Sequence, residues 1–265
     1  MTGPHSLEAA IARDRRLVVS AILGLTALSW AYLVWMAGDM AGDTTGGMGS
    51  GMPMAMSMGP AVWTPVYAVL MLAMWVVMMA GMMLPSALPM ILTFATIGRR
   101  RRDRDQPHVA TAVFVCGYLI AWGGFSVAAV AAQWGLEQAA LLSPMMVSTS
   151  PAFGGLLLIA AGIYQLTPLK HACLRHCRSP FDFVLNRWRD GAAGALRMGA
   201  EHGLYCLGCC WVAMALLFVF GVMNLLWIAA LAILVLMEKV VPGGHRIAQG
   251  AGIFMVAGGV CMLAS

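Results

Sequence analysis

Charged residues are scarce in this chain, and their scarcity excludes most classes of soluble protein. Only 10% of the 265 residues are charged, whereas 61% are hydrophobic. That composition belongs in lipid, and it is too apolar for a cytosolic enzyme of this length. The net charge is +5, and the charged residues occur in short clusters between apolar runs. This placement is typical of a membrane topology signal and argues against nucleic acid as a partner.

Other absences narrow the class further. The seven cysteines lack the spacing of a small secreted disulfide framework, since five of them lie between Cys173 and Cys210. The remaining two, Cys116 and Cys261, are expected to be small apolar residues within helices. No nucleotide-binding or phosphorylation motif is present, so any transport would be passive or driven by a partner. The first apolar run, residues 17–37, has no small-x-small cleavage site at its end, so we expect a retained helix.

Seven apolar runs predict an all-α fold, a polytopic membrane helix bundle that forms a single domain over residues 1–265. The expected spans are residues 17–37, 64–97, 109–132, 152–166, 201–220, 225–237 and 247–263. All 16 Lys and Arg residues fall in the segments 1–16, 98–108, 167–200 and 238–246. The positive-inside rule makes these segments cytoplasmic, which places the N-terminus in the cytoplasm and the C-terminus outside, in the periplasm. The expected location is the inner membrane of a bacterium.

The stretch EHGLYCLGCCW, at the start of the fifth expected span, carries four soft-metal ligands. At about 100° per residue, these side chains project into one arc of roughly 100° on one side of a helix. They are His202, Cys206, Cys209 and Cys210. Imidazole and thiolate together suit copper(I), zinc or an iron centre, and thiolates favour the softer metals. One helix rarely closes a coordination sphere, so we expect other segments to contribute.

A second group of candidate ligands lies in the basic segment 167–200, which we expect to be a cytoplasmic loop. Cys173 and Cys177 are four residues apart and share a face if the segment is helical, with His171 and His176 beside them. Thiols survive in the reducing cytoplasm. The alternative for the cysteine pair is an inert or lipid-modified interfacial role. Whether this group and the fifth-span cluster form one site or two stays open.

Methionine supplies a third group of candidates. The Gly- and Met-rich segment 38–62 is expected to be a periplasmic loop whose thioethers capture copper(I) where thiols would be oxidised. In the second span, Met78 and Met82 are the candidate ligands in a row of four methionines that share one helical face. This methionine row comprises Met71, Met74, Met78 and Met82. The alternative for the loop is a low-complexity linker. The alternative for the methionine row is ordinary core packing, since methionine is a flexible core filler. Pro85 and Pro89 predict a kink in the same span.

Some polar residues are assigned structural roles. Glu201 stands at the expected start of the fifth span, where the helix dipole favours an acidic side chain. Asn224 is expected to cap or close the turn before the sixth span. Glu238 and Lys239 are expected to form an ion pair at the membrane interface.

Five sequence blocks give the chain a family resemblance. The blocks are Met74–Met90, Pro168–Pro180, His202–Trp211, Gly221–Trp227 and Glu238–Gly244. With these blocks the chain resembles a bacterial family of predicted metal-binding integral membrane proteins of unknown biochemical function. The blocks cover the chain from about residue 63 onward and leave out the first span and the Met-rich loop. The resemblance implies metal binding and names no metal, substrate or reaction.

Three functions are compatible with these patterns. The favoured one is copper(I) handling: uptake, transfer or insertion into a periplasmic or membrane metalloprotein partner. The second is a membrane oxidoreductase, or a redox subunit, that carries an iron, haem or copper centre or exchanges disulfides. The third is a structural subunit in which zinc ties the fifth span to residues 171–177. No catalytic residue is assigned, so the sequence does not decide whether the protein is an enzyme, and its oligomeric state stays open.

Overall fold

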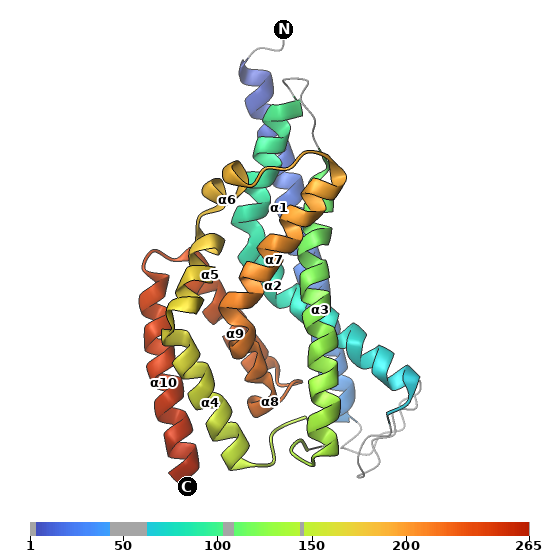
Figure 1. The fold of residues 1–265 in the computed structure, drawn as a ribbon. Helices are drawn as coiled ribbons and strands as arrows, with labels where there is room; N and C mark the ends of the chain where they lie inside the picture. The colour runs from blue at the N-terminus through green and yellow to red at the C-terminus, as the bar shows by residue number, and fades with distance from the viewer. Residues whose placement is uncertain (1–3, 43–62, 103–108, 144–145, 265) are drawn as a thin grey trace.

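The computed structural model describes residues 4–42, 63–102, 109–143 and 146–264 (Figure 1). Regular structure in these residues is helical, apart from one isolated bridge between Leu142 and Ser148. The helices are α1 (Pro4–Gly42), α2 (Pro65–Arg102), α3 (Thr111–Gln138), α4 (Pro151–Leu166), α5 (Pro168–Arg178), α6 (Pro180–Asn186), α7 (Gly191–Ala215), α8 (Leu217–Phe220), α9 (Leu225–Val240) and α10 (Gly244–Ala264). The predicted all-α class is confirmed. Most of the Met-rich segment, residues 43–62, lies outside the described residues.

Five helical stretches are long and apolar enough to cross a membrane. They are Ala12–Asp39, Pro65–Arg102, Thr111–Gln138, Gly191–Phe220 and Gly244–Ala264. A sixth span results if α4 and α5, which meet at a 62° bend, are taken as one broken helix. Helix α9 has 16 residues, about 24 Å of helix, which is shorter than the ~30 Å hydrocarbon layer. The described chain therefore offers five to six candidate spans, and the predicted seven and their orientation stay predictions.

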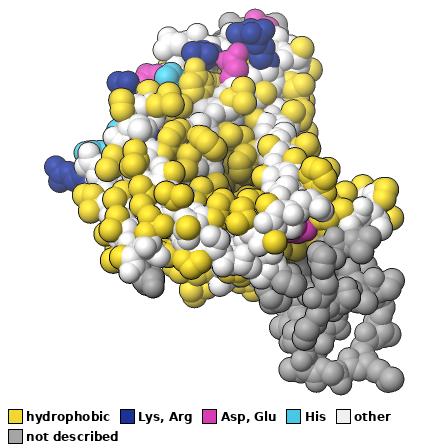
Figure 2. Space-filling model, turned by 60° about the horizontal axis from the view of Figure 1, so that its bottom comes forward, with side chains coloured by type: hydrophobic (Ala, Val, Ile, Leu, Met, Phe, Trp, Pro, Cys, Tyr) yellow, Lys and Arg dark blue, Asp and Glu magenta, His cyan; other side chains and the backbone are white. Residues whose placement is uncertain are grey.

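The surface of the molecule separates apolar from basic side chains. Figure 2 shows hydrophobic side chains over most of one face, with Lys and Arg gathered along its upper and left margins. The start of α1 and the end of α10 lie at opposite ends of the bundle (Figure 1). This distribution is compatible with a multi-pass membrane protein whose basic side chains lie at one end.

Small residues allow the helices to pack closely. A Cβ atom at Gly117 of α3 would collide with the carbonyl group of Leu196, and one at Gly199 of α7 would collide with the backbone of α3. Helices α4 and α10 approach in the same way, through Gly162 and Gly252. In lipid no hydrophobic force drives helices together, so close backbone contact of this kind is a main source of packing energy.

Helix α7 begins ten residues before the predicted fifth span. It starts at Gly191, so Glu201 lies well inside the helix and the predicted dipole role for Glu201 is wrong. Its carboxylate pairs instead with Arg187 at 3.4 Å, Arg189 at 3.4 Å and Arg197 at 3.2 Å. These ion pairs are partly exposed, and the next residue of α7, His202, is buried.

Other local predictions have mixed outcomes. Pro85 and Pro89 lie inside α2, and Figure 1 shows this helix bent. Asn224 caps α9, since its Oδ1 accepts a hydrogen bond from the Leu226 amide at 3.2 Å. The basic segment 167–200 is mostly helical, because it contains α5, α6 and the first turns of α7.

Candidate metal centre

The predicted ligand face of α7 is buried in full. His202 is 2% exposed, Cys206 is fully buried, and Cys209 and Cys210 are each 1% exposed. Helical periodicity brings these four side chains to one face, and that face packs against α3 and α5. A set of ligands at this depth can hold a metal away from water.

Cys206 is the centre of a buried polar network. Its sulfur lies 2.8 Å from Lys239 Nζ and 3.1 Å from the Tyr118 hydroxyl. Lys239 also donates to Ser86 Oγ at 3.1 Å, and the Tyr118 hydroxyl donates to the Met83 carbonyl at 3.2 Å. Side chains and backbone from α2, α3, α7 and α9 therefore converge on one thiol. An ammonium group at this distance can balance the charge of a thiolate.

The thiols of the other two α7 cysteines are hydrogen-bonded to the backbone of α7 itself. The thiols of Cys209 and Cys210 each donate to the Cys206 carbonyl at 3.0 Å. Within the described part of the chain, no group of three or more His, Cys, Asp or Glu side chains is arranged to hold a metal ion. Rotation about χ1 would free both thiols, since each has other staggered positions. The structure thus places the ligands on one face without assembling a coordination sphere.

His202 occupies an aromatic enclosure. Its ring lies 5.6 Å from Tyr118, 6.2 Å from Phe114 and 5.7 Å from Phe183, measured between centroids. Its Nδ1 atom is buried and has no hydrogen-bond partner among the described residues. Leaving a buried polar atom unpaired costs about 1–3 kcal/mol, so the position calls for an explanation. A ligand that bonds to this nitrogen would supply one.

Helix α5 brings the second cysteine pair to α7. A Cβ atom on Gly208 would lie 2.9 Å from Cys173 Sγ, so this thiol covers the gap that the glycine leaves. The Cys177 thiol interacts with Cys209. Both α5 cysteines are half-buried, whereas those of α7 are buried. The sequence left open whether the α5 cysteines and the α7 cluster form one site, and in the fold the two groups are neighbours.

The two histidines of α5 are more exposed than the cysteines of α7. His176 is exposed, its ring stacks on Tyr205 at 4.2 Å, and its Nδ1 is 3.0 Å from the Ala172 carbonyl oxygen. His171 is half-buried. Neither has a described interaction with a cysteine thiol.

The methionine candidates lie on α2. Met78 is fully buried and Met82 is 2% exposed. Met82 also lines an apolar cavity of about 170 Å³ between α1, α2 and α9, and none of the predicted cysteine ligands lines it. The next turn of α2 carries Ser86, which binds Lys239. The methionine row therefore leads along α2 toward the Cys206 network.

Sequence reasoning missed a buried ion pair next to the cysteines. Glu238 pairs with Lys170 at 2.7 Å and accepts from Gln165 at 2.9 Å, while Lys170 also donates to Gln165. The predicted interfacial pair of Glu238 with Lys239 is wrong, because Lys239 turns instead to Cys206. Each of these lysines falls in a basic segment of the sequence, and only the helix packing reveals that both are buried.

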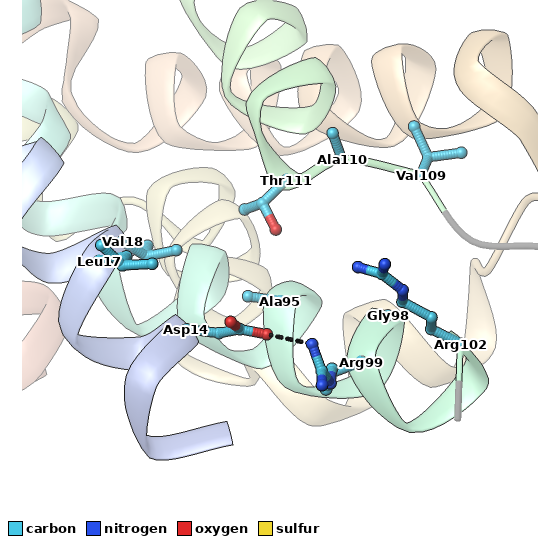
Figure 3. A pocket seen from close by; sticks show the side chains of 10 residues that line it. All are labelled: Asp14, Leu17, Val18, Ala95, Gly98, Arg99, Arg102, Val109, Ala110 and Thr111. Carbon is cyan, nitrogen blue, oxygen red and sulfur yellow. Dashed lines mark hydrogen bonds and ion pairs between the residues drawn. The ribbon is translucent and has the colours of Figure 1, made fainter. Parts of the chain in front are cut away.

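A separate pocket lies at the basic end of the molecule. It has a volume of about 330 Å³ and lies between α1, α2 and the start of α3 (Figure 3). Asp14 and Arg99 form an ion pair of 3.2 Å across it, and Arg102 also lines it. None of the predicted metal ligands contributes to this pocket, so it is not part of the candidate metal centre.

Comparison with known proteins points to copper. A family model described as a copper chaperone, PpoB2, matches residues 72–262. That range contains all ten predicted ligands and excludes the Met-rich segment. It supports a copper-related family, a more specific description than the metal-binding resemblance of the sequence blocks. Searches of the curated proteins and of the solved structures found no match.

Proposed function

This chain belongs to the PpoB2 copper chaperone family, and from that premise we propose that it receives copper(I) on the buried face of α7 and passes it to a metalloprotein partner. One observation carries the proposal: His202, whose buried Nδ1 has no hydrogen-bond partner in the described part of the chain, shares this face with three buried cysteines. Imidazole and thiolate ligands suit copper(I). The partner is expected in the periplasm or the membrane.

The charges around Cys206 support this assignment. A copper(I) ion held by two thiolates carries one net negative charge, and a third thiolate makes it two, so a buried site of this kind is costly unless a cation lies beside it. Lys239, 2.8 Å from Cys206 Sγ, supplies that cation. We assign copper to Cys206 together with Cys209, Cys210 and His202, after the two hydrogen-bonded thiols rotate away from the helix backbone.

Helix α5 provides the route of exchange. Cys173 and Cys177 lie against α7 and are half-buried, so a ligand of a membrane partner can reach them on the cytoplasmic side more easily than it can reach the α7 cysteines. Copper(I) would move between the two pairs by ligand exchange, with no change of oxidation state. His171 and His176 lie on the same helix and would assist at the surface.

The methionines provide the approach from the other side. Met78 and Met82 are followed on α2 by Ser86, whose hydroxyl binds the lysine at Cys206. We propose that thioethers in residues 38–62 capture copper(I) and that the α2 row conducts it inward. Thioethers remain usable in an oxidising compartment where thiols are lost.

The proposed setting is a bacterial inner membrane with seven spans. These are the five candidate spans, α4 and α9, while α5 lies in the basic segment on the cytoplasmic side. The basic end is cytoplasmic under the positive-inside rule, and the C-terminus is periplasmic. An odd number of spans agrees with the start of α1 and the end of α10, which lie at opposite ends of the bundle (Figure 1).

Anaerobic competition titration tests the copper site. Detergent-purified protein is titrated with copper(I) against bicinchoninate, and the variant Cys206→Ser/Cys209→Ser/Cys210→Ser is compared with wild type. We expect the variant to lose one copper equivalent, because serine hydroxyls are poor ligands for a soft metal.

The control is Cys116→Ser/Cys261→Ser, which removes two exposed thiols. This control should titrate as wild type does. Equal copper binding by the triple variant and the control would contradict the proposed site.

A further inference from the structure

A second group of sulfur and polar side chains lies far from the cysteines, at the end of the bundle that carries the C-terminus. The last turns of α3 reach this end, opposite the basic end (Figure 1). There, Gln133 Nε2 lies 3.7 Å from Met71 Sδ and 3.6 Å from Met146 Sδ. The same nitrogen lies 2.9 Å from Glu137 Oε1. Two thioethers and one carboxylate thus converge on a single point, which an amide nitrogen occupies.

The side chains that meet here are mostly buried, and Gln133 has a further hydrogen bond that fixes its position. Met71 and Gln133 are fully buried, and Met146 is 4% exposed. The other end of the Gln133 amide accepts from Trp75 Nε1 at 2.9 Å. Thioether sulfur is only a weak hydrogen-bond acceptor, so two sulfurs make a poor environment for an amide donor. The same two sulfurs are good ligands for a soft cation.

The backbone of Met146 adds a second observation. Its φ angle is +55°, in the left-handed region that non-glycine residues seldom adopt. Such a conformation costs on the order of 1 kcal/mol and tends to occur at functional positions. The Met146 side chain is buried, and its sulfur meets Gln133.

The charge balance of this end favours a cation. Glu137 accepts from Trp63 Nε1 at 2.7 Å and from Gln133, and it forms no salt bridge among the described residues. The sequence contains no Lys, Arg or His between residues 17 and 98 or between residues 109 and 169. A partly buried carboxylate without a basic neighbour attracts a positive ion.

We propose that Met71, Met146 and Glu137 form a second copper(I) site, at the end of the bundle opposite the basic residues. The Gln133 amide marks the position of the ion and swings aside when copper binds. The ion meets two soft neutral ligands and one negative charge, so the site is electrically neutral. This inference deepens the proposed copper function, since it gives copper captured outside a place to bind at Met71, the first residue of the α2 row.

The test uses a protein whose cysteine cluster has been removed. In the Cys206→Ser/Cys209→Ser/Cys210→Ser background, Met71→Leu/Met146→Leu is titrated with copper(I) against bicinchoninate. We expect the loss of one remaining copper equivalent. In the same background, Glu137→Gln keeps the shape of the side chain and removes its charge, and we expect copper binding about 10-fold weaker or more.

The matched control is Met90→Leu/Met255→Leu, which replaces two other buried methionines. It should retain the equivalent that the Met71 and Met146 variant loses. Equal copper binding in the two methionine variants, or unchanged affinity after Glu137→Gln, would overturn the outer site. Either outcome would leave the cysteine result standing, because that result comes from a different comparison.

Discussion

At the scale of single residues, His202 lowers the stability of the fold and, in the proposed site, supplies a ligand for copper. The ring is enclosed by aromatic side chains and its Nδ1 atom has no partner among the described residues. A buried polar atom without a hydrogen bond is destabilising, and an apolar ring of similar size avoids that penalty. Functional positions often show this conflict between stability and activity.

Replacement of His202 by Phe should separate the two effects. We expect the melting temperature in detergent to stay the same or rise, because no hydrogen bond is lost and the aromatic contacts remain. Copper(I) affinity should fall by about 10-fold or more, as for loss of a metal-site residue. A lower melting temperature with unchanged copper affinity would mean that His202 has only a packing role.

The buried lysines show the limit of sequence reasoning at this scale. Lys170 and Lys239 occur in basic segments, where a topology signal is the simplest interpretation, yet both side chains are buried. Their partners are Glu238, 68 residues along the chain from Lys170, and Cys206, 33 residues from Lys239. No local pattern predicts contacts of that range, whereas helical periodicity is local and placed the α7 cysteines on one face.

At the scale of helices, the contact between α3 and α7 positions the candidate metal centre. Gly117 and Gly199 allow the two backbones to touch, which brings Tyr118 to Cys206 and Phe114 to His202. The sequence predicted both helices but started α7 too late, since residues 191–200 are rich in glycine and alanine and resemble a loop. In the fold, those small residues pack closely against α3, and tertiary contact overrides the low helix propensity of glycine.

A single methyl group should disturb this contact. Gly117→Ala places a Cβ atom against the Leu196 carbonyl, so α3 and α7 must separate. We expect a melting temperature several degrees lower, from a destabilisation of roughly 1–3 kcal/mol. The control is Gly124→Ala, since a Cβ atom there meets nothing within 4 Å. Equal stability of the two variants, measured by thermal unfolding in detergent, would show that the helices do not depend on this approach.

At the scale of the whole molecule, topology decides which compartment each sulfur group faces. The proposed seven spans place the methionines of residues 38–62 outside and the α5 cysteines in the cytoplasm. Thioethers tolerate an oxidising compartment and thiols survive in a reducing one. The arrangement is chemically consistent only in this orientation.

Reporter fusions at the C-terminus of the full chain test the orientation. We expect alkaline phosphatase fused there to be active and green fluorescent protein fused there to be dark, because both would lie in the periplasm. A fusion after residue 108 should behave oppositely. A fluorescent C-terminal fusion would show that the number of spans is even or that the orientation is reversed.

The central claim is that this protein carries copper on its cysteine and histidine face. The most direct measurement is the metal content of detergent-purified protein from copper-supplemented cells, combined with a visible absorption spectrum of the same sample. We predict copper without a visible band in the wild-type protein, and loss of one copper equivalent in Cys206→Ser/Cys209→Ser/Cys210→Ser. Iron with a Soret band, zinc alone, or a folded protein without metal would contradict it.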